Sequence, residues 1–151
     1  MFHSKYIEYK AEAYRQMNVA LKSTEYLCVL SDIYNALQPI QRYAVAVDTF
    51  DYMFDDDGFS HWYFSDYAQI TMSVLQELFC VAVTTIDDID EIRVIYSIER
   101  AIERSRWLLK NKQEDELDLA TTNELAEIQS TYRSLRPQFI AVMKQWFETQ
   151  S

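Results

Sequence analysis

Turn-forming residues are scarce in this chain of 151 residues, which contains one Gly and two Pro. Sandwiches and barrels of β-strands need many tight turns, and tight turns depend on Gly and Pro. Hydrophobic residues make up 49% of the chain and charged residues 25%, as in an ordinary folded domain. The sequence therefore predicts an all-α protein with its own core, not a β-sheet protein or a disordered chain.

Hydrophobic periodicity predicts six or seven helices. The apolar stripes cover residues 7–21, 26–37, 40–54, 67–78, 92–109, 125–135 and 139–147. Pro39 suits the first turn of the third helix, Thr121 with Glu124 fits a capping box, and Pro137 should stop or kink the sixth helix. No Gly/Ser-rich linker or internal repeat divides the chain, so we expect a single compact helical domain over residues 1–151.

Acidic residues are concentrated in one third of the sequence. The formal net charge is -10, and no Lys or Arg occurs between Arg42 and Arg93. This base-free window holds Asp48, Asp51, Asp55, Asp56, Asp57, Asp66, Glu77, Asp87, Asp88, Asp90 and Glu91. Outside the window, 13 acids are balanced by 14 bases, so the window carries the whole net charge. Such a one-sign field attracts a basic partner and repels nucleic acid and anionic membranes.

Other stretches carry charge of either sign. A second base-free run, from Gln113 to Tyr132, contains six acids, four of them between residues 114 and 118. The segment from Arg93 to Lys112 is net +4, and we expect it to pair with acids on neighbouring helices.

Regular spacing on a helix could let the acids imitate DNA. Asp48, Asp51 and Asp55 fall at i, i+3 and i+7, which places them on one helix face with neighbours about 5–6 Å apart. Double-stranded DNA presents a similarly dense row of phosphates. The alternative is a solvated face, with Asp87 and Asp88 serving only to start a helix.

The only Gly lies in a turn that is crowded with aromatic residues. We expect Gly58 to adopt a positive φ or to allow a close backbone approach. Eight aromatic residues occur between positions 50 and 67. They fit either core packing around a tight turn or an exposed anchor for a protein partner.

The turn resembles a signature in a family of small bacterial helical proteins, which reads Asn-Gly-Gly-Phe-x-Gln followed by two aromatic residues. The matching residues are Gly58, Phe59, Trp62 and Tyr63. Asp56, Asp57 and His61 stand where the family has Asn, Gly and Gln. That family includes an acidic protein that mimics DNA and occupies the DNA-binding face of a transcription factor. The resemblance implies an all-α fold, no cofactor and a DNA-binding protein as partner.

The sequence does not match the common motifs for metal binding or catalysis, either in the spacing or in the number of the required residues. With Gly58 at the sixth position of a calcium loop, Met53 and Phe64 would stand where the first and last carboxylates belong. Two His residues leave little material for zinc or a catalytic triad. His61 fits a structural hydrogen-bonding role better than that of a general base. Cys28 and Cys80 lie in apolar helical stretches and are expected to be small buried residues.

The sequence therefore predicts a non-enzymatic, cytoplasmic DNA mimic that inhibits a basic DNA-binding protein, such as a transcription factor or a nucleoid protein. It predicts no cofactor and no direct contact with nucleic acid or membrane, and a homodimer would double the acidic surface. The expected partner-binding residues are Asp48, Asp51, Asp55, Asp56, Asp57, Asp66, Asp87, Asp88, Asp90 and Glu91. One alternative is an immunity or antitoxin protein that neutralises a basic toxin, and another is an enzyme with a site around His61.

Overall fold

Helices account for nearly all of the computed structural model, which describes residues 4–23, 30–56 and 58–150. No strand occurs in these ranges, and the all-α prediction is confirmed. The elements are α1 (Lys5–Ser23), α2 (Leu30–Asn35), α3 (Pro39–Asp56), α4 (Phe59–Tyr63), α5 (Asp66–Thr85), α6 (Ile89–Leu109), a short 3-10 helix η1 (Glu114–Glu116) and α7 (Leu119–Glu148).

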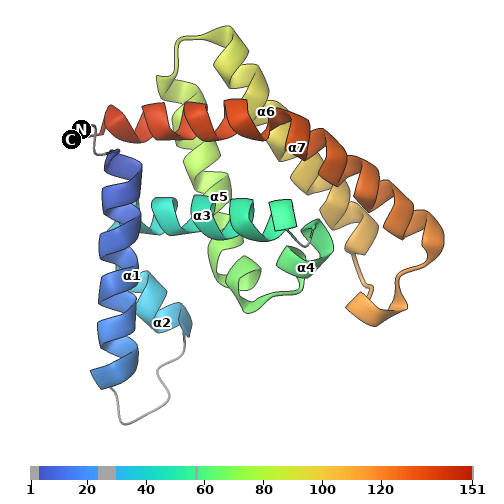
Figure 1. The fold of residues 1–151 in the computed structure, drawn as a ribbon, viewed down its shortest axis with the longest axis horizontal. Coiled ribbons are helices and arrows are strands. Elements are labelled where there is room, and N and C mark those ends of the chain that lie inside the picture. The colour runs from blue at the N-terminus through green and yellow to red at the C-terminus, as the bar shows by residue number, and fades with distance from the viewer. Residues whose placement is uncertain (1–3, 24–29, 57, 151) are drawn as a thin grey trace.

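The central helix is α3, which contacts α1, α4, α5 and α7 (Figure 1). The longest helix, α7, runs across the molecule and packs along α6. Its C-terminal end meets the start of α1, where the Lys5 backbone N–H donates to Glu148 Oε1 at 2.6 Å. This arrangement places segments from both ends of the chain beside α3.

Aromatic rings fill the centre of the core. Phe50 of α3 packs edge-on against Trp62 and Tyr132, with ring centroids 5.2 and 5.5 Å apart. Phe54 lies 4.5 Å from Tyr132, and Phe139 completes the cluster on α7. Rings in such edge-to-face contacts stabilise a core beyond the apolar area that they bury. Core packing is therefore the role of Phe50, Phe54 and Trp62, whereas Tyr52 and Tyr67 are 68% and 37% exposed.

Several helix boundaries differ from the prediction. Pro137 lies inside α7, which is 30 residues long, so the proline does not stop the helix. Buried Tyr132 and Phe139 anchor this helix on either side of Pro137, and their packing outweighs the lost backbone hydrogen bond. The capping box at Thr121 is also wrong, because α7 begins at Leu119, before Thr121, and Asp118 is its N-cap. The predicted 26–37 helix is described only from residue 30 onward, as α2.

Two exposure predictions are also wrong. Ile7 and Leu21 were expected in the apolar stripe of the first helix, but they are 49% and 51% exposed. The buried positions of α1 are Tyr6, Ala13 and Met17, of which Met17 was expected in the stripe. Cys80 is exposed on α5 rather than buried. Cys28 lies outside the described residues.

One helix within the described residues, α5, is long and apolar enough to cross a membrane by length and composition alone. A core helix passes the same test, and α5 contributes six buried residues to the fold. This property is weak evidence for a membrane span.

Candidate functional site

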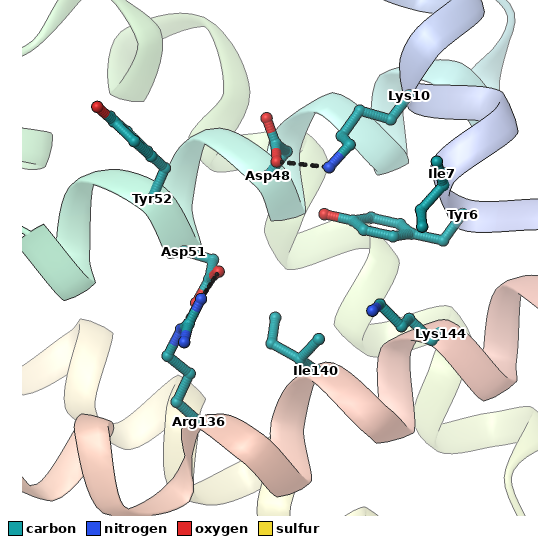
Figure 2. A pocket seen from close by; sticks show the side chains of 9 residues that line it. All are labelled: Tyr6, Ile7, Lys10, Asp48, Asp51, Tyr52, Arg136, Ile140 and Lys144. Carbon is teal, nitrogen blue, oxygen red and sulfur yellow. Dashed lines mark hydrogen bonds and ion pairs between the residues drawn. The ribbon is translucent and has the colours of Figure 1, made fainter. Parts of the chain in front are cut away.

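Two of the predicted partner-binding acids, Asp48 and Asp51, line a cleft between α1, α3 and α7. The cleft has a volume of about 470 Å³. Figure 2 shows its lining side chains, which are Tyr6, Ile7, Lys10, Asp48, Asp51, Tyr52, Arg136, Ile140 and Lys144. The cleft therefore combines acids from the base-free window with bases from the two ends of the sequence.

Asp48 is held by two side chains of α1. One carboxylate oxygen is 3.1 Å from Lys10 Nζ, and the other accepts a hydrogen bond from the Tyr14 hydroxyl at 2.6 Å. The side chain of Asp48 is 29% exposed. Burial and the hydrogen bond to Asp48 raise the pKa of Tyr14, so its hydroxyl stays a donor. Asp48 thus joins α3 to α1.

Asp51 is bound even more completely by α7. Arg136 donates to both carboxylate oxygens, through Nε at 2.7 Å and Nη2 at 3.0 Å. The Tyr132 hydroxyl adds a hydrogen bond of 2.5 Å. The side chain of Asp51 is only 14% exposed. Paired planar groups of this kind give strong, directional hydrogen bonds. Asp51 therefore joins α3 to α7.

Counter-charges thus reach the base-free window from elsewhere in the fold. Lys10 is 38 residues from Asp48 in sequence, and Arg136 is 85 residues from Asp51. The expectation that the window lacks counter-charges is wrong for these two acids. Each carboxylate is paired with a basic side chain, Asp48 with Lys10 and Asp51 with Arg136, so the two do not form a carboxylate pair for acid–base chemistry.

Tyr6 forms part of the wall of the cleft, beside Lys10 (Figure 2). It is 5% exposed, and Lys10 Nζ lies 5.0 Å from its ring centroid. Burial raises the pKa of Tyr6, and the charges of Asp48 and Asp51 raise it further. The phenol is therefore neutral at any ordinary pH, and it packs as part of the core.

The Gly58 turn adopts the expected positive φ, which is 87°. Gly58 N–H donates to Met53 O at 3.1 Å, and a Cβ at this position would lie 3.2 Å from Gln129 Oε1. The same Gln129 donates through Nε2 to Phe54 O at 3.0 Å. The close approach of α7 and the positive φ both explain why the turn carries Gly.

The other residues of the family-like motif are distributed on both sides of this turn. Trp62 is completely buried, and Tyr63 is partly buried with its ring 5.1 Å from Phe64. Asp55 and Asp56 are the last residues of α3. Asp57 and the side chains of Asp55, Asp56 and Phe59 lie outside the described part of the structure.

His61 connects the motif to the second base-free run. Its Nδ1 is 3.9 Å from Glu114 Oε1, and its side chain is 50% exposed. This contact brings α4 next to η1, where the side chains of Glu114, Asp115 and Glu116 are all exposed. We call these three acids the η1 end. Sequence spacing did not show that the motif and this run are neighbours.

A second exposed acidic group lies where α5 turns into α6. We call Asp87, Asp88, Asp90 and Glu91 the α6 corner. Asp88 caps α6 by accepting hydrogen bonds from the backbone N–H groups of Asp90 and Glu91, at 2.9 and 3.4 Å. Glu91 is partly buried and the other three are exposed. The corner is therefore both a helix start and a concentrated negative surface.

The predicted site residues do not form one continuous surface. Asp66 is the first residue of α5 and lies about 30 Å from the α6 corner, because 20 residues of α5 separate them. The α6 corner and the η1 end lie beyond opposite ends of α6 (Figure 1). With 21 residues, α6 is about 32 Å long. Among the described side chains, two exposed acidic groups thus remain, one at each end of this helix.

Sequence reasoning missed the outer face of α6. Trp107 is 67% exposed and Tyr96 is 44% exposed. Both fall outside the apolar stripe that the sequence predicts for this helix. Their position off that stripe already indicated that they would be exposed. Exposed apolar residues indicate a contact surface when they belong to a contiguous patch.

Comparisons with known proteins found no match. No protein-family model matches the chain, and neither the curated proteins nor the solved structures contain a match. Among the residues that the structure describes, no group of three or more His, Cys, Asp or Glu side chains could hold a metal ion.

Proposed function

We propose that this protein occupies the basic surface of a DNA-binding protein in place of DNA. The acids that carry the contact are those of the α6 corner and the η1 end. The observation that supports this proposal is their separation of about one length of α6, or about 32 Å. Dimeric DNA-binding proteins commonly place their two recognition elements about 34 Å apart, one helical turn of B-DNA.

Charge is the second support. Six of the seven acids in the two groups are exposed. The Lys and Arg side chains of a DNA-binding surface neutralise phosphates, and they pair with carboxylates through the same electrostatic attraction. Binding of this kind weakens steeply as salt rises.

The structure narrows the set of acids on which the proposal rests. Asp48 and Asp51 are excluded, because bases of α1 and α7 already bind them. Asp88 and Asp118 are left out of the test, since both cap helices and their loss would perturb the fold.

Displacement from DNA is the direct test of mimicry. DNA-binding proteins from a bacterial lysate are loaded on DNA-cellulose at low salt, and the purified protein is added as the eluent. We expect it to release one or a few basic proteins. A variant with Asp87→Asn, Asp90→Asn, Asp115→Asn and Glu116→Gln should release far less.

A matched control removes four exposed acids from other places. These are Glu8, Asp32, Asp66 and Glu127, changed to their amides. The control has the same net charge as the test variant, so it should elute the same proteins as the unaltered chain. Equal elution by both variants, or no elution by the unaltered chain, contradicts the proposal. Release of a nuclease would instead support the alternative of an immunity protein.

A further inference from the structure

The outer face of α6 carries a continuous stripe of aromatic, aliphatic and charged side chains. Its members are Ile89, Arg93, Tyr96, Arg100, Glu103 and Trp107, all exposed. They recur every three or four residues, so they share one face of the helix. Ile89 is 57% exposed, and Trp107 is 67% exposed. We call this set the α6 stripe.

Trp107 is fixed in its exposed position. The Arg104 guanidinium lies 4.8 Å from the centre of its ring, and Arg104 Nε donates to Glu124 Oε1 of α7 at 2.7 Å. A ring held in this way loses little conformational freedom on binding. Aromatic and Arg side chains of this type dominate the energetics of protein interfaces.

The stripe is self-complementary about its midpoint. Ile98 lies at the centre, with Ile89 and Trp107 nine residues away on either side. Arg93 and Glu103 are each five residues from the centre, and Tyr96 and Arg100 are each two. In an antiparallel pair of identical helices, residues at equal distances from the centre come level with each other.

We infer that the α6 stripe binds the α6 stripe of a second copy of this chain in antiparallel orientation. Arg93 of each copy then faces Glu103 of the other, and this ion pair occurs twice. Ile89 packs on Trp107 of the second copy, and Arg100 lies over the Tyr96 ring. Such an interface is isologous, as in most soluble homodimers.

Charge order along α6 selects this orientation. The helix begins with Asp90 and Glu91, whereas Arg104, Arg106 and Lys110 follow near its C-terminal end. Parallel helices would place like charges side by side, which disfavours that arrangement. Antiparallel helices place the acidic start of each copy beside the basic end of the other.

The pairing has one consequence for the binding of a basic partner, and this consequence rests on the proposed function. The arginines of the stripe lie between the two acidic groups, where they would repel a basic partner. Pairing covers these arginines against the second copy. The assays below contain no DNA-binding protein, so their outcome is independent of the proposed function.

Charge reversal tests the pairing by sedimentation equilibrium at low salt. We expect the full chain to dimerise, and Arg93→Glu or Glu103→Arg to weaken the dimer at least about tenfold. Trp107→Ala should weaken it as well. Circular dichroism checks that each variant keeps its helix content.

Mixing the two charge-reversal variants gives the decisive comparison. Arg93→Glu and Glu103→Arg are each self-repelling, but together they form a heterodimer in which both ion pairs are restored, one with its original sign and one with inverted sign. Within one chain these positions are ten residues apart, about 15 Å along α6, so no intrachain contact explains a rescue. We expect the mixture to associate about as strongly as the unaltered protein. A monomeric unaltered chain, or a mixture that associates no better than its components, overturns the inference.

Discussion

Replacement of Asp51 by Asn separates the two roles that this residue could have. The sequence places Asp51 in a partner-binding surface, where Asn would remove charge without affecting stability. The structure instead gives it three hydrogen bonds, two from Arg136 and one from Tyr132. Asn offers one acceptor and turns an NH₂ group toward donors. We therefore expect Asp51→Asn to destabilise the fold.

The size of the effect follows from burial. Removing one partner of a fully buried ion pair costs about 3–5 kcal/mol, and an exposed pair is worth about 0–1 kcal/mol. Asp51 is 14% exposed and Arg136 is 42% exposed, so the pair lies between these limits. We expect a loss of about 2–3 kcal/mol in the free energy of unfolding. For a domain of this size, that loss lowers Tm by roughly 5–10 °C.

Urea unfolding followed by circular dichroism measures this loss, with Asp90→Asn as the control. The side chain of Asp90 is 85% exposed, so its replacement should leave the midpoint unchanged. In a double-mutant cycle, Arg136→Gln should cost much less when Asp51 is already Asn. If Asp51→Asn destabilises the protein no more than Asp90→Asn, the reasoning is refuted, and Asp51 returns to the set of free surface acids.

Three further changes test the turn, the cap and the proline. Gly58→Ala should cost about 1–3 kcal/mol in urea unfolding, because φ is 87° and the new Cβ meets Gln129 Oε1; an unchanged midpoint would contradict the strained backbone. Asp118→Ala should lower Tm at pH 7. Hydrogen bonds from Thr121 lower the pKa of Asp118, so this stabilisation is present above the ordinary value of 3.8 and is lost as pH falls below it; a deficit independent of pH would exclude the carboxylate as its source. Pro137→Ala restores a backbone donor within α7 and should raise the free energy of unfolding by about 1–2 kcal/mol, and a decrease would mean that the proline shapes the helix for packing.

Local patterns predicted much of the fold. The scarcity of Gly and Pro predicted helices, and Pro39 is the first residue of α3 as expected. Gly58 has the expected positive φ. Asp88 caps α6 in the region where acids were expected to start a helix. Each of these features depends on a few neighbouring residues, which is why sequence alone contains the signal.

The candidate site was less predictable, because its contacts link distant segments. The partners of Asp48 and Asp51 come from α1 and α7, and nothing in the spacing around either acid specifies them. The helix does not stop at Pro137 for the same reason, since tertiary packing on α3 decides whether α7 continues. A base-free window in sequence is therefore a poor guide to unpaired acids in space.

Charge changes sign twice along α6: the corner is negative, the outer stripe holds arginines, and the η1 end is negative again. In multipole terms this order is a linear quadrupole added to a net charge of -10. The net charge attracts a basic partner from every direction. The field of the quadrupole orients that partner, and it decays faster with distance than the field of the net charge. With a screening length of about 8 Å at physiological ionic strength, the rotation acts only just before contact. Added salt should therefore slow encounter before it alters the geometry of a bound complex.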